Sequence, residues 1–304
     1  MKVPLLLVIQ RTQNEHGLPM RAFYSMVELS RQGFHQALSR ENREVLKWQT
    51  LPDLVKEYRK RVDARAGSRS LYFNLNVKSL YQVGITQFER KMAALGLTLP
   101  RLKTRVITTH SVIRSYNYHN QIKGLTVSGI NQVVVGDITY IKTQQVWRYL
   151  FCLTDVYSGR IVGWNYSPTM TALDAYECLI QWEQLRGKEA LEMCFHHSDG
   201  GGQYFSRLYL NKTGDLGVRM SRAENCLQNG RAEQINGLVK HHLIPNIQGR
   251  SVSKVRKELA TLVQQYNNDR KQEGLMWMSP AEFERYVAQE GTAPLMKLYN
   301  FDPK

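Results

Sequence analysis

Three closely spaced runs rich in β-branched and aromatic residues lie in the middle of the chain. They cover residues 132–141, 147–154 and 160–166, and the turn-forming stretch Asp155–Gly159 separates the last two. Neighbouring parallel strands need a crossover of a dozen residues or more, whereas antiparallel neighbours are joined by short turns. The spacing therefore predicts an antiparallel three-stranded meander.

Helices and strands alternate after this meander. Thr171 can cap a helix that runs to about Arg186. The pattern then predicts a strand at 192–197, a short helix near 204–211, a strand at 217–220, a helix that contains Glu233 and ends before Pro245, and a helix at 252–272. This order indicates an α/β domain.

An aspartate interrupts the first strand of the meander. Asp137 follows the apolar run 133–135 and Gly136, so the pattern puts a carboxylate in a buried strand. Burial of an ionised carboxylate is costly unless a cation or hydrogen bonds compensate the charge. Asp137 is therefore a candidate metal ligand.

Two further carboxylates stand in different contexts. Asp199 follows the strand predicted at 192–197 and precedes three glycines, so the chain leaves the strand through a turn that exposes the side chain. Glu233 shares the polar face of its predicted helix with Asn236 and Lys240. Taken singly, each acid could be a turn cap or a surface charge, but in combination they predict one site.

Such a site suits hard divalent cations such as Mg2+ or Mn2+, which prefer oxygen ligands. Two ions held about 3.5–4 Å apart can stabilise both the attacking and the leaving oxygen of a phosphodiester. The three acids therefore predict metal-dependent phosphoryl transfer on DNA.

The residues around these acids resemble those of DDE transposases and retroviral integrases. The resemblance is closest to the longer, second-frame product of bacterial insertion sequences that carry two overlapping frames. The matching stretches are Gly136–Ile141, His197–Asp199, Gly202–Tyr204, Met220–Arg222, Asn225–Cys226 leading to Glu233, Tyr266–Arg270 and Ser279–Phe283. The interval between Asp199 and Glu233 is slightly shorter than is usual in the family. Glu224 and Gln228 also stand where the family more often has small or acidic residues.

The resemblance implies an α/β ribonuclease-H-like catalytic core, with a mixed five-stranded sheet and flanking helices, preceded by small helical DNA-binding segments of the helix-turn-helix type. It implies a polynucleotidyl transferase in which Asp137, Asp199 and Glu233 are catalytic and hold two Mg2+ (or Mn2+) ions when DNA is bound. The expected partners are duplex DNA at element ends and target, further copies of the chain on that DNA, and a helix-turn-helix protein encoded in a first frame.

Two other functions stay open at the level of sequence. A metal-dependent nuclease of the same fold would process DNA or RNA without joining strands. A domesticated DNA-binding protein would keep the core without its activity. DNA-binding segments ahead of the core argue against the nuclease, and an intact triad argues against the silent core.

Positive charge is concentrated before the core. The chain carries a net charge of +15, and residues 1–124 hold 21 Lys and Arg against 8 Asp and Glu, whereas residues 125–304 hold 20 against 18. The first part is therefore expected to supply most of the attraction to DNA phosphates.

Residues 1–50 form the first expected segment, with two amphipathic stretches that join near Ser30 as a helix-turn-helix requires. An ordinary helical hairpin fits this pattern equally well. Residues 51–123 form a second segment, in which Thr86–Glu89 is a capping box and Gly96 can end the helix. A basic linker from about residue 100 follows, then the core at 124–248 and a helical extension at 249–304. The DNA contacts expected from the two segments are Arg31, Arg90, Lys91, Arg101, Lys103 and Arg105.

Four residues near the acids are further candidates for DNA contacts: His197, Gln203, Asn236 and Lys240. In retroviral integrases, the positions that correspond to Asn236 and Lys240 contact the DNA end. A solvated helix face would also explain Lys240, and His197 could instead be a satisfied strand-end histidine. Asp155 is the alternative to the triad, although hairpin turns favour Asp for local hydrogen bonds.

The cysteines and the apolar pattern bear on cellular location. The four cysteines are widely spaced without the CxxC separation of zinc modules, so we expect reduced thiols in a cytoplasmic, nucleoid-associated bacterial protein. The apolar start of the chain lacks the cleavage site of a signal sequence, and no stretch approaches the roughly 20 apolar residues of a membrane span. No membrane partner is expected.

Overall fold

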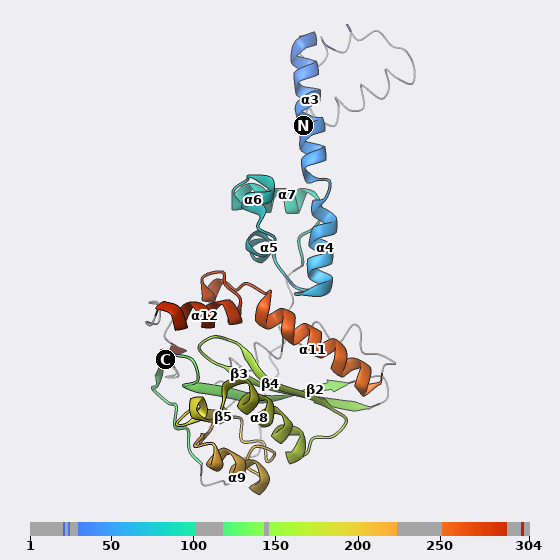
Figure 1. Ribbon diagram of the computed structural model, residues 1–304. Coiled ribbons are helices and arrows are strands. Elements are labelled where there is room, and N and C mark those ends of the chain that lie inside the picture. Colours follow the sequence, from blue (N-terminus) through green and yellow to red (C-terminus); the bar gives the residue numbers. More distant parts are fainter. Residues whose placement is uncertain are drawn as a thin grey trace. The chain divides into compact units, whose positions relative to one another are not determined.

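The protein divides into two compact units, which Figure 1 shows in a computed structural model. Unit 1 comprises residues 1–57 and 77–97, and unit 2 comprises residues 58–76 and 98–304. The structure describes residues 21, 24, 30–100, 118–142, 146–223, 237, 251–290 and 299–300. None of the helices in these described parts is both long and apolar enough to cross a bilayer.

Unit 1 is helical. α3 (Arg31–Trp48) begins at Ser30, whose hydroxyl accepts a hydrogen bond from the Gly33 amide at 3.0 Å. The helices that follow are α4 (Leu51–Arg61), within which the boundary between the units falls, α6 (Val77–Tyr81) and α7 (Ile85–Ala94). Trp48 stacks on Tyr81 with ring centroids 4.8 Å apart. One helix of 18 residues thus occupies the second half of the expected helix-turn-helix, and most of the first half lies outside the described residues.

The predicted start of α7 was wrong, and its predicted end is confirmed. The helix begins after Gly84, which makes no side-chain capping bond, so Thr86 is not the cap of a capping box. At the other end Gly96 adopts φ +66°, and the amides of Gly96 and Leu97 bond to the carbonyls of Ala93 and Met92. This Schellman arrangement needs the left-handed backbone that glycine adopts without strain.

Unit 2 contains a mixed five-stranded sheet with the order β4-β3-β2-β5-β6. Its strands are β2 (Val133–Lys142), β3 (Trp147–Asp155), β4 (Ile161–Ser167), β5 (Phe195–Ser198) and β6 (Arg219–Arg222). β2, β3 and β4 form the predicted antiparallel meander, while β5 runs parallel to both β2 and β6. The ribonuclease-H-like fold expected from the sequence is confirmed. A separate small sheet pairs β1 (Thr126–Val127) with β7 (Tyr299–Asn300).

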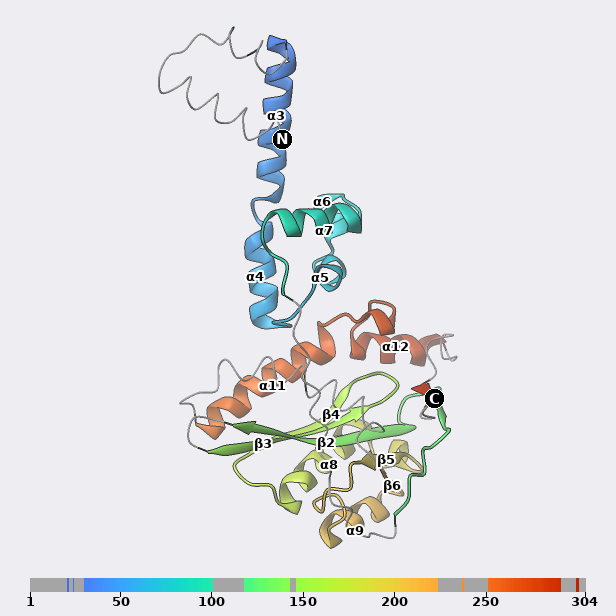
Figure 2. The same ribbon diagram turned by 180° about the vertical axis from the view of Figure 1, so that it is seen from behind.

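Helices cover both faces of the large sheet (Figure 2). α8 (Ala172–Arg186) and α9 (Arg207–Asp215) lie on one face, and α11 (Val252–Asn268) lies on the other. Serine or threonine caps begin all three helices, and Thr171 forms a reciprocal capping box with Asp174. α12 (Pro280–Glu290), which the periodicity did not predict, follows α11.

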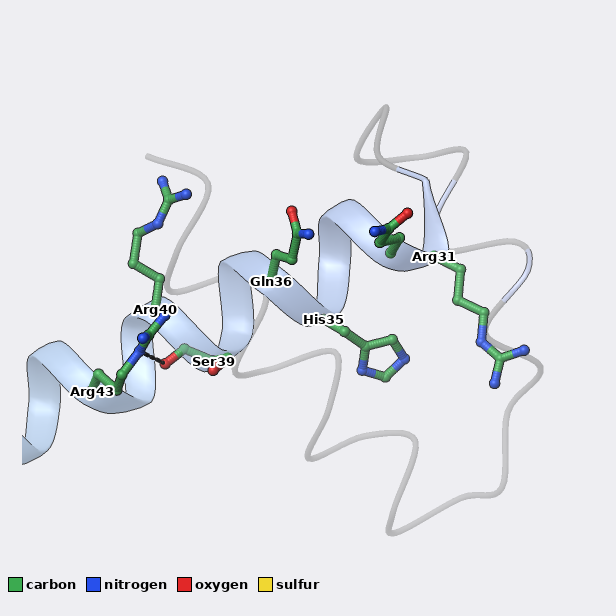
Figure 3. A pocket seen from close by; sticks show the side chains of 7 residues that line it. Arg31, His35, Gln36, Ser39, Arg40 and Arg43 are labelled. Atoms are coloured by element: carbon green, nitrogen blue, oxygen red, sulfur yellow. Dashed lines mark hydrogen bonds between the residues drawn. The ribbon is translucent and has the colours of Figure 1, made fainter.

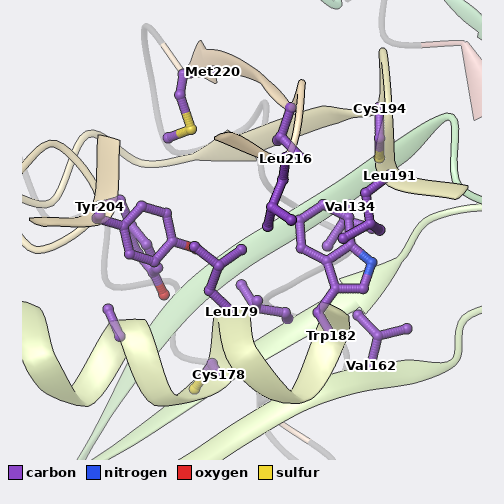
Figure 4. Close-up of a cluster of buried hydrophobic side chains, with 14 of the residues drawn as sticks. Val134, Val162, Cys178, Leu179, Trp182, Leu191, Cys194, Tyr204, Leu216 and Met220 are labelled. Carbon is purple, nitrogen blue, oxygen red and sulfur yellow. The ribbon is translucent and has the colours of Figure 1, made fainter. Parts of the chain in front are cut away.

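The main core fills the space between the sheet and α8 (Figure 4). Trp182 and Leu179 from α8 meet Val134 and Val162 from the sheet. α8 approaches the sheet closely, because a Cβ at Gly163 of β4 would lie only 2.2 Å from the Cys178 carbonyl oxygen. Only glycine fits this contact.

Residues 58–76 pack against the chain that follows α11. Phe73, in α5 (Ser68–Asn74), stacks on Trp277 with ring centroids 3.8 Å apart. Asp63 pairs with Arg270 at 2.9 Å between carboxylate and guanidinium, with both side chains largely buried. Part of the expected second DNA-binding segment is therefore built into the unit that carries the sheet.

Candidate active site

Two of the three predicted acids come together on the sheet. β2 and β5 are parallel, with Gly136 paired to Ser198. Asp137 and Asp199 each follow one of these residues, so they occupy neighbouring positions where β5 ends. Adjacent strands lie about 4.8 Å apart, a spacing that lets carboxylates at neighbouring positions share one cation. Asp137 is half-buried and Asp199 is exposed.

The charges of both acids contribute to the raised pKa values of two tyrosines. Burial raises the pKa of Tyr140, and the charges of Asp199 and Asp137 add to this effect. Burial also raises the pKa of Tyr204, with further contributions from Asp137 and Asp199. Both carboxylates therefore lie within electrostatic reach of each phenol. Two like charges this close repel each other, and a bound cation would offset that repulsion.

Close packing beneath β2 positions Asp137. A Cβ at Gly136 would lie 2.7 Å from Cε1 of His196 and 3.2 Å from Cζ of Tyr204. The absence of a side chain at residue 136 lets these two rings pack against the strand. His196 is itself held by Tyr209, whose hydroxyl lies 2.6 Å from the His196 Nε2.

The glycine turn positions Asp199. The Gly201 amide donates to Asp199 Oδ1 at 3.1 Å, and Gly200 adopts φ +85°, which disfavours any other residue. Gln203 donates from its side-chain amide to the Met170 carbonyl oxygen at 3.1 Å. The role of Gln203 in the structure is therefore to tie the turn to the loop before α8.

The two aspartates supply oxygen donors of the kind that Mg2+ and Mn2+ prefer, so the residues present fit such an ion. Glu233, Asn236 and Lys240 lie outside the described residues. Within the described residues, no group of three or more His, Cys, Asp or Glu side chains is placed to hold a metal.

Asp155 does not join this pair. It is paired with Val134, three residues before Asp137 on β2, and its side chain is fully buried. Its carboxylate accepts hydrogen bonds from the amides of Asn131 at 2.7 Å and Ser158 at 2.8 Å. These bonds give Asp155 the local turn-stabilising role that its sequence context favours.

His197 does not have the DNA-facing position expected of it. Its side chain is fully buried on β5, and its Nδ1 lies 2.9 Å from the Ser221 hydroxyl. Burial lowers the pKa of His197 to about 4, so the ring is neutral near pH 7. His197 is instead a buried histidine at the end of a strand, with a hydrogen-bond partner inside the core.

Several basic residues of unit 1 line an open groove along α3, which Figure 3 shows. The side chains that line it are Arg31, Gln32, His35, Gln36, Ser39, Arg40 and Arg43. On α7, Arg90 is exposed, whereas the Lys91 ammonium lies over the Trp48 ring, 5.6 Å from its centroid. Arg101, Lys103 and Arg105 lie outside the described residues.

Sequence reasoning gave no role to Tyr140 or Tyr204. Both belong to the stretches that match the family, but their relation to the acids depends on the parallel pairing of β2 with β5. The signal that could have drawn attention to Tyr140 is its position three residues after Asp137 in a strand whose neighbours are mostly apolar.

Comparison with known proteins identifies the family of the sheet-bearing unit. Residues 128–226 and 215–280 each match a family model described as integrase core domain. The chain is 30% identical over 262 residues to the putative transposase for insertion sequence element IS986/IS6110 of Mycobacterium tuberculosis, which covers 82% of this chain and 93% of that protein. It is 31% identical over 211 residues to the transposase for insertion sequence element IS629 of Shigella sonnei, covering 68% of this chain and 70% of the relative.

Solved structures with which the chain aligns include two of retroviral proteins. The HTLV-2 integrase catalytic core domain in complex with magnesium aligns with a TM-score of 0.42 and 16% identity, covering 53% of this chain and 99% of that chain. A chain of the simian T-cell lymphotropic virus intasome aligns with a TM-score of 0.45 and 15% identity, covering 83% of this chain and 79% of that one.

Proposed function

Since the chain belongs to the insertion-sequence transposases that carry an integrase core domain, we propose that Asp137, Asp199 and Glu233 form its catalytic metal site. Transposases of this kind are enzymes of the nucleotidyl-transferase type. The proposed reaction is cleavage of a DNA strand at the element end, followed by transfer of the new 3′ hydroxyl to a target phosphodiester.

The observation that carries this proposal is the parallel register of β2 and β5. It sets Asp137 beside Asp199, and the charges of both reach the same two tyrosines. The position of Glu233 is supported by its place on the polar face of a predicted helix and by the family resemblance around it.

The protein's share of the chemistry is to hold cations and substrate in place. When bound, two Mg2+ or Mn2+ ions would activate the attacking oxygen and stabilise the leaving oxygen. Asp137 supplies a ligand from within a strand that packing beneath Gly136 fixes, while the exposed Asp199 leaves space for a phosphate. No covalent intermediate on the protein is required, so no Ser or Tyr nucleophile is proposed.

Charge and family support duplex DNA and further copies of the chain as partners, whereas a first-frame protein is proposed from the sequence resemblance alone. Duplex DNA is the substrate, and α3 with Arg31 and Arg43 along its groove offers contacts to phosphates. Copies of the chain would assemble on the DNA, and a helix-turn-helix protein encoded in a first frame would add recognition. We expect the protein to act in the cytoplasm, at the nucleoid.

The test is a strand cleavage and joining assay with Mg2+ on duplexes that carry the element end. Asp137→Asn, Asp199→Asn and Glu233→Gln should each abolish both steps and keep DNA affinity, because affinity comes mainly from basic residues elsewhere. Asp215→Asn, at an exposed acid in α9, is the matched control and should keep full activity. Activity of the wild-type level in any triad variant would refute the assignment of that residue. Cleavage without joining in the wild type would instead favour a nuclease.

A further inference from the structure

The groove along α3 carries positive charge that no acid of the helix offsets. The side chains that line it within the described residues are all exposed, and none of them is acidic. Three are arginines, namely Arg31, Arg40 and Arg43. The two acids of α3, Glu41 and Glu44, are half-buried instead and do not line the groove. The groove face therefore suits an anionic partner.

Packing on the opposite side of α3 fixes which side chains line the groove. Phe34 and Leu38, one helical turn apart, are buried, and so is Trp48 at the end of the helix. The Phe34 ring meets the Tyr24 ring edge to face with centroids 5.3 Å apart, and Trp48 stacks on Tyr81. Rotation of α3 about its axis would expose these rings to water, so the basic face is held outward.

Arginines at the two edges of this face flank uncharged amides. Arg31 and Arg40 lie about two and a half helical turns apart, so their side chains extend to opposite sides of α3, as Figure 3 shows. Gln32 and Gln36 are both exposed, lie one turn apart, and fall between those two directions around the helix axis. The major groove of duplex DNA has the same order across its width, with phosphates at both edges and base edges between them.

We propose that α3 reads the base sequence of duplex DNA in the major groove. Gln32 and Gln36 contact base edges, while Arg31 and Arg40 contact phosphates of the two strands. The major groove admits an α-helix, a glutamine amide can form paired hydrogen bonds with adenine, and residues near the start of a recognition helix are those that meet the bases. The inference rests on the proposed function, since it takes duplex DNA as the substrate, and it adds the residues that select the sequence.

The side chains between the arginines favour duplex DNA over other anionic partners. A membrane surface would need apolar side chains to bury, and none lines the groove among the described residues. An acidic protein segment would pair with the arginines but would leave the amides without a defined role. Amides that both donate and accept hydrogen bonds match the donors and acceptors of base edges.

The experiment uses the full-length protein without divalent cations, so that binding is measured without cleavage. Selection from a library of random-sequence duplexes gives the base preference of each protein. Fluorescence anisotropy then gives the affinity for the selected duplex and for a scrambled duplex of the same composition, at a series of salt concentrations.

The wild type should select a consensus that contains adenine. Gln32→Ala and Gln36→Ala should each lower the preference for the selected over the scrambled duplex about 5- to 150-fold, which corresponds to about 1–3 kcal/mol per base pair. The affinity for the scrambled duplex should not change. Gln184→Ala, at an exposed glutamine of α8, is the matched control and should keep the full preference.

Arginine variants should behave differently. Arg31→Gln and Arg40→Gln should weaken binding to both duplexes and keep the consensus, because phosphates carry no base identity. Each should also reduce the slope of log affinity against log salt by about 0.9, the value for one phosphate contact.

The absence of a consensus for the wild type, or an unchanged preference in both glutamine variants, would overturn the assignment. Competition by polyglutamate as strong as that by the selected duplex would also overturn it and assign the face to an acidic protein. Asp137→Asn protein should select the same consensus, which separates the two proposals. A catalytically active Asp137→Asn enzyme refutes the proposed active site, whereas a wild type that cleaves element ends but binds without base preference refutes only the reading role of α3.

Discussion

Two pairs of acids in unit 2 differ in what surrounds them. Asp155 and Glu284 are buried, and the Ser158 hydroxyl lies 3.0 Å from the Asp155 carboxylate and 2.8 Å from that of Glu284. Glu284 also forms ion pairs with Arg160 and Arg186. Asp137 lies on β2, three residues after Val134, the partner of Asp155. Asp137 and Asp199 lie at neighbouring positions near an exposed turn.

The difference separates acids that stabilise the fold from acids that are proposed to bind a cation. Although burial alone would raise the pKa of Glu284, hydrogen bonds and charge from Arg186 and then Arg160 lower it. The protein itself supplies the positive charge that neutralises Glu284, through Arg160 and Arg186. Asp137 and Asp199 instead occupy neighbouring positions of β2 and the end of β5, and the charges of both reach Tyr140 and Tyr204.

The largest expected difference is in activity. Asp137→Asn should lower the rate of strand cleavage by about three orders of magnitude or more, equivalent to about 4 kcal/mol of transition-state stabilisation. Its thermal unfolding without metal should match the wild type or rise slightly, because a repulsive charge is removed. Asp155→Asn should do the opposite, with lower stability and retained activity at low temperature. Parallel melting curves and cleavage rates measure both, and equal loss of activity in the two folded variants would break the comparison.

The next largest effect concerns Glu284. Glu284→Ala should lower the free energy of unfolding by about 3–5 kcal/mol, because Arg186 is left as an uncompensated buried charge. Urea denaturation of the full chain measures this loss. Glu189→Ala, at an exposed acid, is the control and should change stability by less than about 0.5 kcal/mol. The double variant Glu284→Met with Arg186→Met should regain part of the stability, and a loss larger than that of Glu284→Ala would contradict the ion-pair explanation.

Much of this arrangement followed from the sequence. The meander and the cap at Thr171 depend on local patterns that tertiary contacts did not override. The fifth strand of the sheet was also placed within two residues of its observed start.

Other features depend on contacts between distant residues. β5 begins at Phe195 rather than near residue 192, because Met193 adopts φ +67° and cannot continue a strand. His197 resembled a site residue, but its burial comes from β6, which supplies Ser221. The sequence pattern of α12 does not predict that Glu284 binds arginines more than 90 residues earlier in the chain. The Asp63 pairing with Arg270 likewise joins segments that no local pattern relates.

A smaller effect should appear on acidification. Burial, with a contribution from His197, lowers the pKa of His196 to about 3, from an ordinary value of 6.5. Because the unfolded chain takes up this proton below pH 6.5 and the folded chain does not, stability is fully present above pH 6.5 and falls as the pH drops towards 3. The contribution of Glu284, whose folded pKa is lowered, is lost only at lower pH, below its ordinary value of 4.5.

The slope expected from His196 is about 1.4 kcal/mol of unfolding free energy per pH unit. Denaturant unfolding between pH 6.5 and 5 measures it, and His196→Asn should remove about one proton from the dependence whatever its effect on stability at pH 7. His119→Gln, at an exposed histidine of the same unit, should leave the slope unchanged. An unchanged slope in His196→Asn would show that the ring is protonated in the folded state.

The smallest expected effect is a stabilisation by metal alone. A cation that binds the folded state stabilises it by RT ln(1 + [L]/Kd), about 1.4 kcal/mol when the ion concentration is roughly ten times Kd. Mn2+ should therefore raise the melting temperature of the wild type by a few degrees without DNA, and Asp199→Asn should reduce this shift because one ligand is lost. Glu284→Gln protein should have a lower melting temperature without metal and should show the same Mn2+ shift. Glu284 is paired with Arg160 and Arg186, so it is not expected to bind the ion. A Mn2+ shift that disappears in Glu284→Gln and survives in Asp199→Asn would reverse the roles assigned to the two acid pairs.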